Sequence, residues 1–297
     1  MKQAFIKQLL LSSIVSVCLS TPLPSIAAGL PPFVGGQALP SLAPMLEHSM
    51  PAVVNISTST NIQVNENPLM QDPYFRQFFN VPNQSRQQQK NSLGSGVIID
   101  SNQGLVLTNN HVIDKADKIL VTLTDGRQLN AELIGTDPEA DIAIIKVPAN
   151  NLTQLPIADS SQLKVGDFVV AIGNPFGLGQ TVTSGIVSAL GRSGLGIEGY
   201  EDFIQTDASI NPGNSGGALV NLRGELIGMN TAILAPTGGN VGIGFAIPTN
   251  MIMPIKDVLV KHGVVKRGLL GVTTQDLTPE LVNAFNLDNK HLSLIHI

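Results

Sequence analysis

The chain has 297 residues, of which 43% are hydrophobic, and its 17 basic and 22 acidic residues give a formal charge of −5. This apolar content can build one large domain or two small ones, and it excludes a chain that is disordered throughout. The acidic balance, without a long basic run, argues against a nucleic acid or an anionic membrane surface as a partner.

Residues 1–28 have the pattern of an export signal. Lys2 and Lys7 precede an apolar run over residues 8–19, and the small residues of "SIAAG" offer a cleavage site near Ala27 or Ala28. An N-terminal membrane anchor is the alternative, but the run is shorter than the roughly 20 residues that a spanning helix needs. We therefore expect a cleaved signal peptide and, after cleavage, no stable insertion into a membrane.

The segment that follows predicts little regular structure. Residues 29–44 are rich in Pro and Gly, which predicts an irregular arm, and residues 41–58 predict a short helix that runs into a strand. Residues 61–92 are polar and contain seven glutamines, so we interpret them as a long loop. This loop also carries an aromatic cluster of Tyr74, Phe75, Phe78 and Phe79.

From Leu93 onward the chain alternates short Val, Ile and Leu runs with Gly, Asn, Asp and Pro, which predicts an all-β barrel or sandwich. Helical periodicity is clear only in "IPTNMIMPIKDVLVKHG", where Pro248 can begin a helix and Gly263 can end it. Beyond this helix the sequence predicts a further strand and a capped helix over residues 278–285.

A serine flanked by glycines is the first candidate for chemistry. Ser215 lies in "NPGNSGGALV", directly before an apolar run. Taken alone, such a serine more often marks a turn. A serine hydroxyl becomes an effective nucleophile only when a base takes its proton and a third group orients that base.

A histidine and an acid in the same β-rich region can supply these partners. His111 follows an apolar strand in "LVLTNNHVID", and Asp141 begins the apolar run "DIAIIKV", where an unpaired carboxylate would be costly to bury. Each residue alone could be structural or exposed. Their order, with 30 residues from histidine to aspartate and 74 from aspartate to serine, is that of one known catalytic triad.

The glycines around the serine fit a second role. If the backbone N–H groups of Gly213 and Ser215 point into one small space, they can hold the negative oxygen that forms when the serine attacks a carbonyl. A turn of this kind needs a close approach that a side chain would obstruct. The sequence therefore predicts an oxyanion hole at Gly213 and Ser215.

Three segments resemble the HtrA family of serine proteases, especially its bacterial periplasmic DegP/DegQ type. They are "TNNHV", "DIAIIKV" and "GNSGGALVNLRGELIGMNTAI", and the resemblance extends from about residue 41 to residue 286. It implies a chymotrypsin-like pair of six-stranded β-barrels over residues 29–265, with the active site between them. It also implies His111 as the general base, Asp141 as the orienting acid and Ser215 as the nucleophile, with no metal or other cofactor.

The resemblance also bears on specificity and regulation. Ile210 and Ile233 are implied to line the pocket for the residue before the cut bond, which favours small aliphatic residues over Lys or Arg. Residues 61–92 resemble a regulatory loop that can block a neighbouring subunit, with a disordered insert as the alternative. Arg192 matches a relay position of a sensor loop, but it could be a solvated charge. The GxGxxG pattern at residues 194–199 lacks the helix that a nucleotide site requires.

Residues 266–297 resemble the beginning of the family's first PDZ domain, but the ending "HLSLIHI" departs from the family pattern, so we expect this domain to be incomplete. The family also implies a trimer, or a larger assembly, built through the N-terminal arm near Phe33. The expected function is that of a periplasmic, ATP-independent serine endopeptidase that degrades unfolded or damaged proteins under stress. A chaperone-like binding protein with an inactive triad is the alternative.

Overall fold

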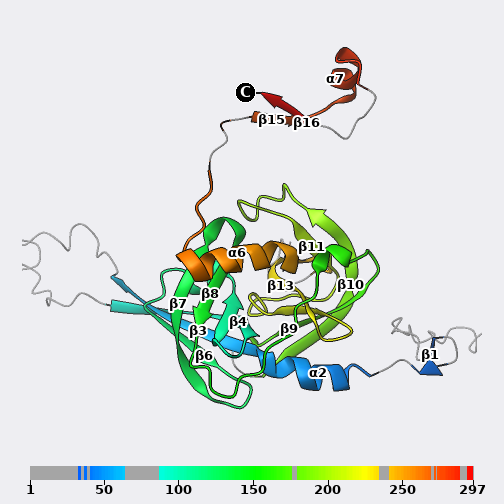
Figure 1. Ribbon diagram of the computed structural model, residues 1–297. Coiled ribbons are helices and arrows are strands. Elements are labelled where there is room, and N and C mark those ends of the chain that lie inside the picture. Colours follow the sequence, from blue (N-terminus) through cyan, green and yellow to red (C-terminus); the bar gives the residue numbers. More distant parts are fainter. Residues whose placement is uncertain are drawn as a thin grey trace, which may run out of the picture. The chain divides into compact units, whose positions relative to one another are not determined.

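Figure 1 shows a computed structural model of the chain. It describes residues 33–34, 37–38, 41–63, 87–175, 179–233, 241–268, 271, 273–287 and 293–296. The expected signal peptide and the aromatic cluster of the expected loop lie outside these residues. None of the helices in the described ranges is long and apolar enough to cross a membrane.

Six antiparallel strands close a first barrel in the order β3-β4-β5-β8-β7-β6. They are β3 (Val53–Gln63), β4 (Gln87–Asp100), β5 (Leu105–Thr108), β6 (Lys118–Thr122), β7 (Gln128–Asp137) and β8 (Ile142–Lys146). The barrel is filled by aliphatic side chains such as Val54, Ile98 and Ile145, which are almost completely buried. All four residues of β5 are buried, and this strand directly precedes the segment that carries His111.

A second barrel follows in the order β10-β11-β14-β13-β12-β9. Its strands are β9 (Phe168–Gly173), β10 (Thr181–Arg192), β11 (Phe203–Thr206), β12 (Ala218–Asn221), β13 (Leu226–Ile233) and β14 (Gly244–Pro248). Its core contains Val169, Ile204 and Leu219 and shares no residue with the core of the first barrel. The expected chymotrypsin-like pair of six-stranded barrels is therefore confirmed.

The strands of the first barrel extend into the stretch expected to be a loop. β3 continues to Gln63 and β4 begins at Gln87, and the two pair in register from Val53 opposite Val97 to Gln63 opposite Gln87. Both ends of the 61–92 stretch are thus strand, because backbone pairing satisfies the peptide groups even where the side chains are polar. Residues 64–86 lie outside the described ranges.

The predicted helix of 14 residues, α6 (Thr249–His262), lies against both barrels (Figure 1). Pro248 precedes its first turn, and Gly263 ends it with a φ of 75°, a left-handed conformation that glycine adopts easily. Its contacts are with β7 and β8 of the first barrel and β13 and β14 of the second. α6 thus connects the two barrels.

The remaining elements are short. They are β1 (Phe33–Val34), β2 (Gln37–Ala38), α2 (Ala43–Ser49), α5 (Asn110–Ile113), α7 (Pro279–Ala284), β15 (Thr273–Asp276), β16 (Ser293–His296) and three 3-10 turns at Met50–Ala52, Pro138–Ala140 and Ser160–Gln162. α7 is the capped helix expected from the sequence: the Thr278 side chain accepts a hydrogen bond from the N–H of Leu281. β15 pairs with β16, so the described parts of residues 266–297 contain a two-stranded sheet and one helix. That this stretch belongs to a PDZ domain stays a prediction.

Candidate active site

The structure brings His111 and Asp141 together. His111 lies in α5, the short helix that follows β5, and its Nδ1 is 2.8 Å from Oδ2 of Asp141. The backbone N–H of His111 also donates to Oδ1 of Asp141, at 2.9 Å. Two hydrogen bonds to one carboxylate fix both the position of the histidine backbone and the direction of its ring.

Asp141 is held by its backbone as well as by its side chain. It follows the turn Pro138–Ala140 with a φ of 53° and directly precedes β8. Its carbonyl oxygen accepts from the N–H of Asn110 (3.2 Å) and from Nδ2 of Asn109 (3.0 Å). Its side chain is only 3% exposed, so these contacts and those of the carboxylate replace the water that burial removes.

The carboxylate of Asp141 also sets the protonation of the imidazole. Burial lowers the pKa of His111, but the hydrogen bond to Asp141 and the negative charges of Asp141 and Glu198 outweigh it, so the pKa lies above its usual value. An anion that accepts from Nδ1 favours the tautomer with the proton on Nδ1. Nε2 is then left unprotonated and able to accept a proton, and the side chain is 51% exposed, so substrate can reach it.

Ser215 lies in a compact turn that contacts both barrels. The N–H of Asn214 donates to Asn211 O (2.9 Å), and the N–H of Gly216 donates to Asn230 O of β13 (2.8 Å). Gly216 has a φ of 82°, and a Cβ placed there would meet the Ser95 carbonyl oxygen. The turn therefore requires glycine at this position, for conformation and for space.

The two predicted oxyanion donors lie in this turn. Gly213 has a φ of 95°, and a Cβ at this position would lie 2.6 Å from Cβ of Pro175. Within the described part of the chain, neither the N–H of Gly213 nor that of Ser215 donates a hydrogen bond to protein, although the neighbouring N–H groups of Asn214 and Gly216 do. Among residues 213–216, these two N–H groups are therefore the ones without a protein acceptor in the described part of the chain.

The hydroxyl of Ser215 does not donate to the imidazole in the described structure. It donates instead to the carbonyl oxygen of Thr231, at 3.1 Å. The Thr231 hydroxyl in turn donates to Oδ2 of Asp141, at 2.8 Å, the same oxygen that contacts His111. The three predicted residues therefore lie in one connected network, with Thr231 between the serine and the aspartate.

The other predicted residues have different surroundings. Ile210 is 1% exposed and packs in the core of the second barrel, near Gly244. Ile233 is the last residue of β13, and its side chain is not among those described. Arg192 is exposed at the end of β10, and its Nε donates to Oε1 of Gln205 on the adjacent strand at 2.8 Å.

A second carboxylate approaches the histidine from the loop between β10 and β11. Glu198 is half-buried there, and its pKa is raised to about 7 by burial and by the negative charges of Asp141 and Glu201, against the opposing effect of His111. The loop is ordered by Glu201, whose carboxylate accepts from the N–H groups of Leu195, Ile197 and Glu198.

The same loop contacts the segment that positions the aspartate. The N–H of Tyr200 donates to the carbonyl oxygen of Glu139 at 2.7 Å, two residues before Asp141. The GxGxxG pattern at residues 194–199 lies in this irregular loop. No helix begins at these residues.

Four residues of this site were missed by the sequence reasoning, namely Ser95, Asn109, Glu198 and Thr231. Two of them are next to predicted motifs: Asn109 is in "TNNHV" and Thr231 is in "MNTAI". Ser95 lies between glycines in "LGSGV", the pattern that had drawn attention to Ser215, and could have been found from it. Nothing in the local sequence distinguishes Glu198 from other loop acids.

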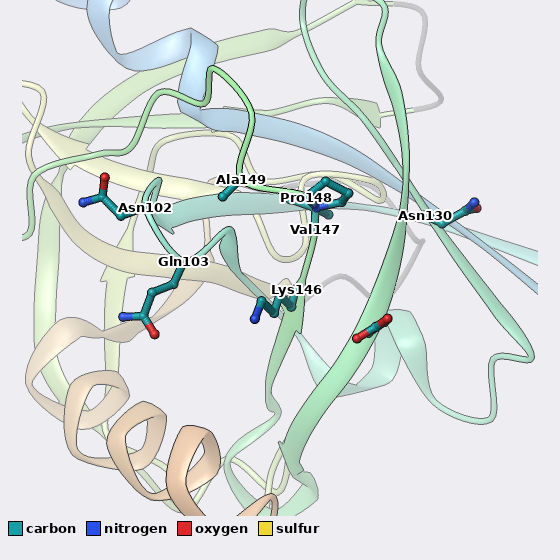
Figure 2. Close-up of a pocket in the computed structure, with 8 residues that line it drawn as sticks. Asn102, Gln103, Asn130, Lys146, Val147, Pro148 and Ala149 are labelled. Carbon is teal, nitrogen blue, oxygen red and sulfur yellow. The ribbon is translucent and has the colours of Figure 1, made fainter.

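A hollow of about 510 Å³ on the first barrel lies apart from this network (Figure 2). Its walls come from the turn after β4, from β7 and β8, and from the segment after β8. The lining residues are Asn102, Gln103, Asn130, Glu132, Lys146, Val147, Pro148 and Ala149. It includes none of the predicted site residues.

The trypsin-like peptidase class is defined by a pair of six-stranded antiparallel barrels and by its site. In that site a buried aspartate is hydrogen-bonded to a histidine, and a serine lies nearby in a turn that contains glycines. Residues 94–229 accordingly match the family model described as a trypsin-like peptidase domain. Within this class, the chain belongs to the HtrA family of proteases, as the following similarities show.

The chain is 57% identical over 266 residues to the periplasmic pH-dependent serine endoprotease DegQ of Escherichia coli K12. The matched residues cover 88% of this chain and 57% of DegQ. It is 52% identical over 292 residues to the periplasmic serine endoprotease DegP of the same strain, covering 90% of this chain and 61% of DegP. The chain thus spans about three fifths of the length of these relatives.

Solved structures give the same result. The HtrA-type protease AlgW with a decapeptide is 48% identical, with a TM-score of 0.69 over 86% of this chain and 78% of the other. The AlgW structure with a tripeptide is 46% identical, with a TM-score of 0.71 over 84% of this chain and 73% of the other.

Proposed function

We propose that this chain is a serine endopeptidase with Ser215 as nucleophile, His111 as general base and Asp141 as the acid that orients it. The N–H groups of Gly213 and Ser215 form the oxyanion hole. The observation that carries the proposal is the buried Asp141 carboxylate, which holds both the backbone N–H and Nδ1 of His111. A structural salt bridge needs no such orientation of the ring, whereas a general base does.

The reaction follows from these positions. Nε2 of His111 takes the proton as the Ser215 Oγ attacks the peptide carbonyl, and the tetrahedral oxygen, now negative, is held by the two backbone N–H groups. The imidazolium then gives its proton to the leaving amine, which leaves an acyl-enzyme. Water hydrolyses the ester by the same steps, with His111 first as base and then as acid.

The Ser215 hydroxyl must change partner for this reaction. In the structure it donates to Thr231 O, and rotation about the Cα–Cβ bond redirects it without moving the backbone. Catalytic hydrogen bonds commonly form only when substrate is present. The same observation supports the second candidate function, a chaperone-like binding protein in which the triad stays inactive.

We further propose that the substrates are unfolded or damaged proteins in the periplasm. A peptide must lie extended to reach a nucleophile between two barrels, and folded proteins rarely offer such a segment. The relatives named as periplasmic endoproteases support this location. A pocket formed by Ile210 and Ile233 would favour a small aliphatic residue before the cut bond, and cleavage mainly after Lys or Arg would contradict it.

We propose that the protein acts as a trimer or a larger assembly. Phe168 and Leu222 are 46% and 48% exposed and line one hollow of about 340 Å³ on the second barrel. Large apolar side chains gathered in this way are typical of contact surfaces. The N-terminal arm of another copy, including Phe33, would cover them.

Unfolded casein separates the two candidate functions. We expect the wild type to cleave it and Ser215→Ala to have no activity, and a fluorophosphonate should label Ser215 in the wild type only, because it reacts with an activated serine. If the two proteins are equally inert but both prevent aggregation of an unfolded client, the chaperone-like function is correct and the endopeptidase proposal is wrong.

A further inference from the structure

Ser95, on β4 of the first barrel, contacts the nucleophile turn of the second barrel with all three of its polar groups. Its hydroxyl donates to the carbonyl oxygen of Gly213 at 2.6 Å, and its N–H donates to the carbonyl oxygen of Ser215 at 2.8 Å. Its own carbonyl oxygen lies where a Cβ on Gly216 would be. The residue is completely buried.

The hydroxyl of Ser95 also holds the segment that packs against the turn. It accepts a hydrogen bond from the N–H of Asn174 at 2.8 Å. The next residue, Pro175, is the one whose ring contacts Gly213. The Ser95 hydroxyl therefore fixes the carbonyl of Gly213 directly. Through its bond to the N–H of Asn174, it also fixes the backbone that leads to Pro175, which packs against Gly213.

These bonds act on the two peptide groups that flank the Asn214–Ser215 peptide. The carbonyl of Gly213 belongs to the peptide that joins Gly213 to Asn214, and the carbonyl of Ser215 belongs to the peptide that joins Ser215 to Gly216. With both carbonyls bonded to Ser95, rotation of the peptide between them, which carries the N–H of Ser215, is restricted. Gly213 is otherwise free to change its φ and ψ because it has no Cβ.

We propose that Ser95 is a positioning residue for the oxyanion hole, which holds the Gly213 and Ser215 N–H groups in their donating orientation through the Gly213 carbonyl. This inference rests on the proposed function, since it assigns a role within the same reaction. Because Ser95 belongs to the first barrel and the turn to the second, the competence of the hole depends on the contact between the barrels.

A purely structural role for Ser95 would make a different prediction. A hydroxyl that only joins the barrels stabilises the fold, and its loss lowers the melting temperature without changing the turnover of the folded enzyme. A positioning role changes the turnover number kcat, because the oxyanion exists only after attack, and it leaves KM nearly unchanged.

The test compares Ser95→Ala with Ser95→Thr in the full chain, using kcat and KM on a peptide substrate, the rate of fluorophosphonate labelling and the melting temperature. We expect Ser95→Ala to lower kcat and the labelling rate about 10- to 100-fold, the scale typical of a displaced catalytic group. Ser95→Thr keeps a hydroxyl and should recover most of this loss. Ser95→Cys fills the space of the serine with a weak donor, so it decides the question if the alanine variant does not fold.

Ser160→Ala is the matched control. Its buried hydroxyl also accepts a backbone N–H between two elements, from Asn250 at 3.0 Å, but it lies away from the turn. It should lower stability and leave kcat at the wild-type value.

The inference is overturned if Ser95→Ala and Ser95→Cys turn over at the wild-type rate, or if Ser160→Ala loses as much kcat as they do. A wild type that neither cleaves nor labels would instead refute the proposed function, and this inference with it.

Discussion

Glu198 places a second negative charge near the imidazole that Asp141 already contacts. Its pKa of about 7 means that this charge changes near neutral pH, and the pKa of His111 beside it is raised above its usual value. The two groups stabilise each other's charged forms: the imidazolium lowers the pKa of Glu198, and the carboxylate raises the pKa of His111. The pH dependence of activity should therefore depend on Glu198.

Glu198→Gln tests this coupling. A general base works only when it is unprotonated, so activity rises as pH passes upward through the pKa of His111. Because the Glu198 charge raises that pKa, its removal should lower it and move the acidic limb of the kcat/KM profile to lower pH. Glu132→Gln, which removes an exposed carboxylate on β7, should leave the limb in place. An acidic limb that stays in place or moves upward in Glu198→Gln would contradict the coupling.

At the scale of elements, α6 depends on a close approach to β7. A Cβ on Gly135 would lie 2.5 Å from the carbonyl oxygen of Gly263, the residue that ends α6. The N–H of Thr136 donates to the same oxygen, at 3.3 Å. Only a residue without a side chain allows the helix end to come this near the strand.

Gly135→Ala should therefore destabilise the chain. The added methyl group meets backbone atoms that cannot rotate away, and overpacking of this kind typically costs about 1–3 kcal/mol. Gly268→Ala is the control, because a Cβ at that exposed position meets nothing within 4 Å. Denaturant unfolding measures both. Equal stabilities for the two variants would show that α6 can shift at no cost.

Elements with local signals were predicted well from the sequence. Pro248 and Gly263 mark the ends of α6 because proline has a fixed φ suited to a helix start and glycine accepts the left-handed angle at its end. The ends of β3 and β4 were missed because their polar sequence gives no alternation of apolar residues. Their pairing with each other, not their composition, makes them strands.

The residues of the site also differ in how far the sequence could predict them. His111, Asp141 and Ser215 could be found because each has a distinctive neighbourhood in the sequence, and the structure brings them into one network. The contacts that Ser95 and Thr231 make could not be predicted, because their partners are 118 and 90 residues away and only the closing of the two barrels brings them together. Contacts between the barrels are a property of the fold that no single segment encodes.

At the scale of the whole molecule, the proposed assembly predicts a contact surface on the second barrel. Phe168 begins β9, and Leu222 directly follows β12, the strand that pairs with β9; both side chains are about half exposed. Val165, 64% exposed, precedes Phe168 by three residues. Phe168 and Leu222 line the same hollow, and exposure of such large apolar side chains to water is unfavourable.

Phe168→Glu should break this assembly. A carboxylate tolerates water but not burial in an apolar contact, so the substitution penalises association far more than folding. We expect sedimentation velocity to show a trimer or larger particle for the wild type and a monomer for Phe168→Glu, with unchanged circular dichroism. Leu133→Glu alters a side chain on the first barrel that is 52% exposed and should leave the assembly intact. A wild type that sediments as a stable monomer, or a Phe168→Glu variant that still assembles, would show that this surface does not join the copies.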